Sequence, residues 1–378
     1  MNVLIITSSY PSHPQDPTGT AGLFVRDFAL ELMRQGHKVV IQPVARKKHY
    51  EPDPGLVIEP LSWQGGDQEL ASMNVFDIRN IWIFFRFFRN GRQKVLNVAK
   101  EYQIDRVLCM WAVPSGIFGL RLKRAMGIPY DVWALGSDIW KIKKIPVLGR
   151  WILTKVIKNA NGVFADGADL CKDIDYITAV KCRFLPSSRK LPAPQAGLKD
   201  LEPSDLCHLR FVGRYHANKG PDLLLEAVNY LPDDVKAKIR LHMFGIGPLE
   251  TKLKGMVQDF KLQTTVSFNG PIEAQELSNY LERVNFLVIP SRIESIPVIF
   301  SDAMQVHTPV ISMPVGSLPE LIGRFHCGVV ASQVTSKSLS DVISQVITQN
   351  KSDFKSATEK ASDQFQITRT VSDWSAEK

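Results

Sequence analysis

The sequence predicts an α/β fold of two parallel-sheet domains, and three observations support this. At 378 residues the chain exceeds one ordinary core, and two domains of about 150–190 residues are expected. Short apolar runs alternate with helix-like stretches throughout, which is typical of a parallel sheet covered by helices on both faces. A segment rich in proline and glycine near residue 190 separates two such patterns.

In the first half, each apolar run is followed by an amphipathic stretch. The expected strand and helix pairs are Val3–Thr7 with Leu23–Gln35, Lys38–Pro43, Arg106–Cys109 with Gly116–Met126, Tyr130–Trp133 with Val147–Asn159, and Gly162–Ala165 with Asp169–Ile177. The run MNVLIITSSY has no basic segment before it and predicts a first strand rather than a signal peptide.

The second half repeats the alternation after a predicted linker. Strands and helices are expected at Leu209–Val212, Asp222–Tyr230, Ile239–Phe244, Pro248–Phe260, Thr265–Phe268, Ala274–Arg283, Asn285–Ile289, Pro297–Gln305, Pro309–Ser312, Leu318–Leu321 and Gly328–Val330, before a charged helical tail. The expected domains are residues 1–188, a linker at 189–205, residues 206–360, and a C-terminal helix at 361–378 that packs back on the first domain. Facing domains of this kind would form a cleft that strand ends and helix starts line.

Composition excludes several classes of protein. The 44% hydrophobic and 22% charged content is globular, and no apolar run approaches the 18 residues of a membrane-spanning helix. The five cysteines form no CxxC pair, which favours reduced thiols in a cytoplasmic protein over a disulfide framework or a zinc site. Residues 1–188 hold 25 Lys and Arg against 17 Asp and Glu, whereas residues 189–378 hold 21 of each. The basic first half suggests an anionic partner.

The segment LRFVGRYHANKG places two cations after a strand. Arg214 and Lys219 follow Gly213 at a predicted strand end, where they suit a diphosphate because arginine offers a planar fork and lysine a point charge. Taken alone, these cations fit a solvated surface loop somewhat better.

The segment MFGIGPLE is a glycine turn between a strand and a helix. It differs from the dinucleotide-binding fingerprint because Glu250 stands where a glycine is required. Gly245 fits a backbone that passes close to a ligand, and it also fits an ordinary tight turn.

The segment PSRIESIPVIFSDAMQ carries two acids in apolar surroundings. Ser295 is expected to cap a helix that has Pro297 in its first turn. The free amides of Ile296 and Val298 would then point at an anion, helped by the helix dipole. Glu294 lies before this helix and Asp302 within it; the simpler alternative is an acid favoured by the dipole plus a solvated acid.

Two N-terminal features concern the opposite wall of the predicted cleft. Gly19 and Gly22 open the first helix, where glycine lets the backbone approach a phosphate or sugar. The triplet Asp173–Ile174–Asp175 resembles a metal-binding DxD pattern, but it lies in a predicted helix whose carboxylates would point apart, which favours a solvated face.

The ordered series GR-x4-KG, FG-x-GP, NGPI, PS-x2-ES-x-P-x4-DAM, PVI and GSLPELI resembles the C-terminal domain of family 4 retaining glycosyltransferases. RQGHKVVI and LGSDIW are similar to the N-terminal domain of that family. The resemblance covers most of the chain and implies the GT-B fold, in which two Rossmann-like domains face each other across a cleft.

The resemblance implies roles for particular residues. Arg214 and Lys219 would hold the donor diphosphate, Glu294 would meet the sugar hydroxyls, and the amides of Ile296 and Val298 would meet phosphate oxygens. The loop from Gly270 to Ile272 would contact the base, and Gly22, Gly213, Gly245 and Ser295 would line the donor site. No metal or other cofactor is implied, because the leaving diphosphate takes the acceptor proton while the cations stabilise it.

Three positions depart from the family pattern. The second acid of the E-x7-E motif, which binds the ribose, is here the shorter Asp302, about 1.5 Å short of a glutamate because it lacks one methylene. Leu135 and Met110 stand where relatives often carry histidine. Because these histidines are absent, no residue of the N-terminal domain is assigned a firm catalytic role. The acceptor is expected near Asp138.

Aromatic and basic residues interleave in Arg79–Lys94, and Trp140–Lys158 is also basic. Such helices lie in membrane interfaces, and this favours contact with an anionic membrane surface over the alternative that the aromatics pack into the core. No nucleic-acid-binding module is recognisable.

Together these features predict a retaining, metal-independent glycosyltransferase that is cytoplasmic or peripheral on the inner face of the plasma membrane. It would move a sugar from a UDP- or GDP-sugar to a glycan or lipid-linked acceptor, in cell-surface polysaccharide or glycolipid synthesis. The alternatives are a catalytically silent nucleotide-sugar-binding subunit and a sugar-nucleotide epimerase or phosphorylase on the same fold.

Overall fold

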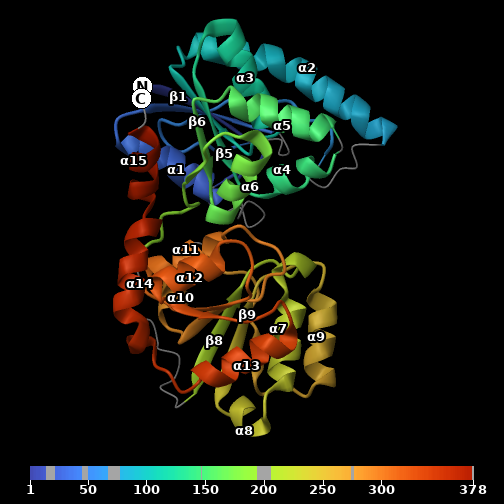
Figure 1. Cartoon of the computed structure of the whole chain (residues 1–378), viewed down its shortest axis with the longest axis vertical. Coiled ribbons are helices and arrows are strands. Elements are labelled where there is room, and N and C mark those ends of the chain that lie inside the picture. Colours follow the sequence, from blue (N-terminus) through green and yellow to red (C-terminus); the bar gives the residue numbers. More distant parts are fainter. Residues whose placement is uncertain are drawn as a thin grey trace. The chain divides into compact units, whose positions relative to one another are not determined.

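The computed structural model describes residues 1–13, 22–44, 50–66, 77–145, 147–193, 206–273 and 276–376. The chain divides into two compact units (Figure 1). Unit 1 consists of residues 1–186 and 370–378, and unit 2 consists of residues 187–369. Each unit is built on a parallel sheet, so the predicted α/β class with two parallel sheets is confirmed.

The sheet of unit 1 has seven strands in the order β3-β2-β1-β4-β5-β6-β7. Their bounds are β1 (Asn2–Thr7), β2 (Lys38–Pro43), β3 (Val57–Ile58), β4 (Arg106–Met110), β5 (Tyr130–Ala134), β6 (Gly162–Ala165) and β7 (Arg183–Phe184). The central strand β1 is apolar from Val3 to Ile6, which are at most 1% exposed, because helices cover both faces of the sheet.

Local sequence signals mark where two helices of the first half begin or end. Asp77 caps α2 by accepting a hydrogen bond from the Arg79 amide at 2.9 Å, whereas Gly127, at φ 72°, ends α3. The bounds are α1 (Leu23–Arg34), α2 (Ile78–Glu101), α3 (Ser115–Met126), α4 (Ser137–Trp140), η3 (Ile142–Lys144), α5 (Leu148–Lys158) and α6 (Ala168–Thr178).

The sheet of unit 2 has six strands in the order β10-β9-β8-β11-β12-β13. Their bounds are β8 (Cys207–Val212), β9 (Ile239–Phe244), β10 (Val266–Phe268), β11 (Phe286–Ile289), β12 (Val310–Ser312) and β13 (Gly328–Val330). The strand order reverses between β8 and β11, and in open parallel sheets ligands bind beyond the strand ends at such a switch point.

Helices lie on both faces of this second sheet, with α7, α9 and α13 on one face and α10, α11, α12 and α14 on the other (Figure 1). The bounds are η4 (Ala217–Lys219), α7 (Pro221–Tyr230), α8 (Asp233–Lys236), α9 (Glu250–Asp259), α10 (Leu277–Glu282), α11 (Val298–Gln305), α12 (Leu318–Phe325), α13 (Ser336–Val346), η5 (Lys351–Phe354), α14 (Lys355–Ser362), η6 (Asp363–Phe365) and α15 (Ile367–Ser375).

The end of α15 belongs to unit 1. Trp374 is fully buried there, and its indole Nε1 donates to the Asp131 carboxylate at 3.1 Å. The Arg106 guanidinium lies 4.3 Å from the Trp374 ring and 2.7 Å from the same carboxylate. This cluster joins the last helix to β4 and β5.

Some details differ from the expectations. The sequence pattern did not reveal the two-residue strands β3 and β7, because so short a run shows no periodicity. Much of the predicted linker and the residues around Gly19 lie outside the described part of the chain. All five cysteines are buried and free of disulfides. Among the described residues, no helix is long and apolar enough to cross a membrane.

Candidate functional site

The candidate site in unit 2 consists of the loops that follow β8, β9, β11 and β12. The loops after β8 and β9 are bound to each other through backbone groups. The Tyr215 amide donates to the Ile246 carbonyl at 2.9 Å, and the Leu249 amide donates to the Tyr215 carbonyl at 3.0 Å. A Cβ on Gly245 would lie 1.9 Å from the Gly213 carbonyl oxygen, and Gly245 has φ 148°. This close approach therefore requires glycine at position 245, whereas Gly213 contributes only its carbonyl oxygen.

The predicted base-binding loop joins the same backbone assembly. The Gly245 amide donates to the Gly270 carbonyl at 2.7 Å, and Ile272 lies two residues further on, partly exposed. The structure thus brings Gly213, Gly245 and the loop of Ile272 together, as expected of residues that line one site.

The loops after β8 and β11 are also in contact. A Cβ on Gly220, which has φ 66°, would lie 1.9 Å from the Pro290 carbonyl oxygen. Arg292 binds the Asp222 carboxylate through two hydrogen bonds of 2.8 and 3.0 Å, and its amide donates to the Asn218 carbonyl at 2.8 Å. This bidentate pair fixes the loop of Lys219 against the loop of Glu294.

Lys219 and Glu294 form an ion pair at the centre of this arrangement. The Lys219 side chain is 37% exposed and that of Glu294 16% exposed, so both groups can meet a ligand from solvent. Gly316 packs closely against the backbone of Glu294, because a Cβ there would lie 2.2 Å from the Glu294 carbonyl oxygen. Arg214 lies on the same loop as Lys219 and is exposed, with no ion-pair partner among the described residues.

The start of α11 offers unpaired donors next to this ion pair. Within the described residues, the amides of Ile296 and Val298 donate no hydrogen bond. The hydroxyl of Ser295 is buried and likewise without a partner there. Unpaired donors at a helix start are typical of an anion site.

One local expectation about this helix is wrong. Ser295 makes no side-chain cap; the N-cap residue is Pro297, and α11 begins at Val298. The proline is extended, at ψ 138°, so the helix starts one residue later and Ser295 stays in the loop. Its hydroxyl is thereby left available to a ligand rather than to the helix.

Asp302 is not the accessible acid that the resemblance implied. It is fully buried, and both carboxylate oxygens accept hydrogen bonds from Arg189, with Nε at 2.8 Å from Oδ1 and 3.0 Å from Oδ2. Burial raises the pKa of Asp302, and Arg189 opposes that rise. Arg189 is a residue that the sequence did not single out, since a lone arginine beside a linker carries no motif.

Further hydrogen bonds hold the Arg189 segment on α11. The side-chain amide of Gln305 donates to the Arg189 carbonyl at 3.0 Å, and the Ser301 hydroxyl donates to the Ser187 carbonyl at 3.0 Å. Asp302 therefore anchors this segment of unit 2 on the helix that begins at the candidate site.

The N-terminal candidates lie in unit 1. Gly22 is the N-cap residue of α1, and a Cβ there would lie 2.8 Å from the Tyr10 Cα. Asp138 is 5% exposed and accepts hydrogen bonds from the amides of Ala112 and Leu135, the latter at 3.1 Å. Burial raises the pKa of Asp138 to about 6, and these amides oppose the rise. The carboxylate thus joins the loops after β4 and β5.

The two acids of the DxD triplet lie in α6, and each has different hydrogen-bond partners. Asp173 accepts from the Trp140 indole at 2.9 Å and from Lys143 at 3.0 Å, whereas Asp175 accepts from the Cys182 amide at 2.6 Å. The two carboxylates serve different contacts in unit 1.

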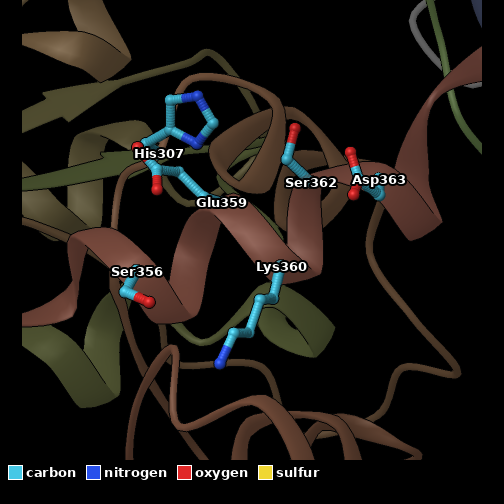
Figure 2. Close-up of a pocket in the computed structure, with 6 residues that line it drawn as sticks. All are labelled: His307, Ser356, Glu359, Lys360, Ser362 and Asp363. Carbon is cyan, nitrogen blue, oxygen red and sulfur yellow. The ribbon is translucent and has the colours of Figure 1, made fainter.

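Unit 2 also has a hollow of about 390 Å³ beside α14 (Figure 2). Its lining mixes one imidazole, two acids, one amine and two hydroxyls, from His307, Ser356, Glu359, Lys360, Ser362 and Asp363. The Lys360 side chain points away from His307 (Figure 2). None of the predicted donor residues lines this hollow.

The aromatic segment of α2 divides between two environments. Phe87 is buried, and Phe84 and Phe88 pack against the same core. On the other side of the helix, Trp82 is 63% and Phe85 56% exposed. The start of α5 is similar, because Leu148 and Trp151 are 57% and 56% exposed.

Residues 200–363 match the family model described as "Glycosyl transferases group 1". An uncharacterized glycosyltransferase of Methanocaldococcus jannaschii is 23% identical over 66% of this chain and 68% of its own length. The alpha-monoglucosyldiacylglycerol synthase of Streptococcus pneumoniae is 24% identical over 76% of this chain and 66% of its own length. The chain thus matches about two thirds of each of these curated relatives.

The crystal structure of the HepE protein of Anabaena in complex with UDP is similar to the whole chain. Its TM-score is 0.72 at 15% identity, covering 100% of this chain and 99% of that one. This likeness shows the fold. Residues 200–363 thus match the Glycosyl transferases group 1 family, and the two Rossmann-like parallel sheets, together with the likeness to HepE, show that the chain has the GT-B fold.

Proposed function

We propose that the protein is a family 4 enzyme that transfers a sugar, with retention and without a metal, from a UDP- or GDP-sugar to a glycan or lipid-linked acceptor. The observation that carries this proposal is the Lys219–Glu294 pair beside the unpaired amides of Ile296 and Val298. A cation, an acid and free amide donors within neighbouring loops match the diphosphate and hydroxyl groups of one nucleotide sugar.

Each group has a chemical role in the proposed reaction. Lys219 and Arg214 neutralise the diphosphate, while the amides of Ile296 and Val298 and the Ser295 hydroxyl donate to its oxygens. Glu294 accepts from the sugar hydroxyls and, without ligand, pairs with Lys219. As the glycosidic bond to the donor breaks, negative charge grows on the leaving diphosphate, which these fixed donors stabilise and which takes the acceptor proton.

The two binding partners are supported by different relatives. The HepE structure contains UDP, which supports a nucleotide donor. The streptococcal relative is named as a monoglucosyldiacylglycerol synthase, which supports a lipid-linked acceptor and a place in glycolipid or cell-surface polysaccharide synthesis. In this proposal unit 1 receives the acceptor near Gly22 and Asp138.

A lipid-linked acceptor fits a peripheral site on the inner face of an anionic membrane. The exposed Trp82, Phe85, Leu148 and Trp151 would enter the interface. The exposed Arg86 and Arg89 on α2 would contact acidic head groups.

Turnover of labelled UDP- and GDP-sugars, with lipid-linked and glycan acceptors, tests the reaction. Glu294→Gln should lower kcat about 10²–10³-fold, as loss of one transition-state contact does, while UDP or GDP binding persists. The control Asp233→Asn changes an acid in α8 whose side chain is 99% exposed, and it should leave turnover unchanged. Donor binding without any turnover in the wild type would instead identify a silent binding subunit.

Sedimentation with anionic liposomes tests the membrane site. The wild type should bind at low salt and release at 0.5 M NaCl, because salt screens the arginines. The double variant Trp82→Ser/Phe85→Ser should lose binding, whereas Tyr230→Ser, which removes a 55% exposed aromatic from unit 2, should retain it. No binding of the wild type to anionic vesicles at low salt would end this part of the proposal.

A further inference from the structure

Arg210, in the middle of β8, is a buried charge without an ionic partner. The residue is 1% exposed, and its Nε and Nη1 atoms are buried with no acceptor among the described residues. Burying a guanidinium is unfavourable unless an anion or several acceptors receive its N–H groups. An arginine in this position therefore points to a ligand that supplies the missing acceptors.

The groups around Arg210 are aromatic or cationic. The guanidinium lies 5.1 Å from the ring centres of both Phe244 and Tyr280. Lys351 is close enough for Arg210 to lower its pKa, although burial is the larger cause; together they bring that pKa to about 8. The Lys351 ammonium donates to the Glu282 carbonyl and, at 3.0 Å, to the Thr308 hydroxyl, both uncharged groups.

A polar strip continues from Arg210 across the same face of the sheet. Arg210 is paired in register with His242, which is paired in turn with Ser267. Because paired residues of neighbouring strands project to the same side, all three side chains lie on the face that carries α10. His208 Nδ1 lies 3.0 Å from His242 Nε2, and His242 Nδ1 lies 3.2 Å from the Ser267 hydroxyl.

Both imidazoles are partly exposed, so the strip leads from solvent to the buried guanidinium. Burial lowers the pKa of His208 and His242, and Arg210 and Arg240 lower both further; His242 reaches about 4. Among the described residues, the charged groups that act on this cluster are Arg210, Arg240, Arg283, Lys351 and the acid Glu282, with Tyr280 as a further titratable group. This excess of positive charge favours an anion.

The strip is separate from the candidate donor site. Gly213 follows β8, three residues after Arg210, and at about 3.3 Å per residue the two backbone positions are roughly 10 Å apart. His208 lies two residues further from the donor loops.

We propose that the strip formed by His208, Arg210, Arg240, His242 and Ser267 binds a phosphate group, with Arg210 as its anchor. A phosphate oxygen pair matches the guanidinium fork. In the strip itself the Ser267 hydroxyl donates to Asn269 and His242 uses both ring nitrogens, so the remaining phosphate oxygens would replace the acceptors of these internal hydrogen bonds. The ligand is inorganic phosphate or the phosphate of a small phosphorylated metabolite, which present the same group. Burial and the two arginines hold the pKa of both imidazoles below 6.5, and that of His242 at about 4, so their protonation strengthens phosphate binding only as the pH falls toward these values.

Thermal unfolding of the full chain with inorganic phosphate, against sodium chloride of equal ionic strength, tests the site. Phosphate should raise the Tm of the wild type but not of Arg210→Met, which keeps the length of the side chain without its charge. The donor loops offer cations too, so Lys219→Met serves as the second variant, and there the phosphate shift should persist. An equal shift in the wild type and Arg210→Met, or a shift lost in Lys219→Met, would overturn the proposal.

Histidine titration by NMR provides a readout that does not depend on Arg210→Met folding. In the wild type, phosphate should raise the pKa of His242 and of His208, while the exposed His326 at the end of α12 serves as the internal control. A hexose phosphate as a second probe distinguishes the sources: tighter binding than inorganic phosphate indicates a metabolite, and equal binding indicates the free ion. Imidazole titrations that phosphate leaves unchanged would contradict the site.

Discussion

The ion pair between Arg189 and Asp302 gives the sharpest quantitative prediction. Asp302 is fully buried, whereas the Arg189 side chain is 13% exposed, and the two groups form a bidentate contact. Removing one partner of a buried pair leaves an uncompensated charge, which typically costs about 3–5 kcal/mol. Replacing both partners with apolar groups is often close to neutral.

The exposure of each partner decides where in that range each variant falls. Asp302→Asn leaves Arg189, which can still reach water, and should cost about 3 kcal/mol. Arg189→Met leaves a fully buried carboxylate and should cost about 5 kcal/mol at neutral pH. The double variant Arg189→Met/Asp302→Leu should lie within about 1 kcal/mol of the wild type.

Thermal unfolding followed by circular dichroism measures these differences. For a unit of this size, about 3–5 kcal/mol corresponds to a fall in Tm of roughly 6–20 °C. The matched control is the exposed pair of Lys337 and Asp341 in α13, whose side chains are 69% and 63% exposed; Asp341→Asn should cost about 0.3–0.5 kcal/mol. Single variants of the buried pair that cost no more than this control would refute the reasoning.

The same pair predicts a dependence on pH. Burial raises the pKa of Asp302, and Arg189 limits that rise. In Arg189→Met the pKa rises further, so the folded state holds its proton more tightly than the unfolded state, whose aspartate has a pKa of about 3.9. The stability of this variant should therefore fall, relative to the wild type, as the pH rises above about 4.

The remaining predictions concern a glycine and a second buried acid. Gly245→Ala would place a Cβ 1.9 Å from the Gly213 carbonyl oxygen, so UDP or GDP affinity measured by calorimetry should fall at least about tenfold, a loss of about 1.4 kcal/mol. The control is Gly255→Ala in α9, where a Cβ meets no atom within 4 Å; it should stabilise the protein by about 0.5–1 kcal/mol and leave nucleotide affinity unchanged. A loss of UDP or GDP affinity that is equal in both variants would contradict the role of the close contact at Gly245. The raised pKa of Asp138, about 6, means that the folded state binds this proton more tightly, so wild-type stability in urea should fall as the pH rises from about 4 to 6. Asp138→Asn should flatten that slope, and a slope that stays unchanged would show that another group causes it.

Comparison of particular residues shows what the sequence could predict. The apolar runs predicted β2, β6, β9 and β13 with their bounds. In β6 both faces are buried and apolar, whereas β9 alternates buried apolar residues with the partly exposed Arg240 and His242. Gly213 and Gly245 could be recognised because a strand that ends in glycine has a distinct local pattern. The expectation that α2 is either a membrane helix or a core helix was too simple, since Phe87 is buried and Trp82 on the same helix is exposed.

The sequence by itself determined the two α/β halves and the loops that carry the donor chemistry, since strand periods, helix starts and glycine turns depend on neighbours in the chain. Only the tertiary structure decided which charges meet. Lys219 forms an ion pair with Glu294, 75 residues away, and Asp302 forms one with Arg189, 113 residues away. It also buried Arg210 with no acceptor for its Nε and Nη1 atoms among the described residues. Strand order and helix packing determine which distant residues meet. The order of amino acids in the sequence does not show the distances between them in the fold.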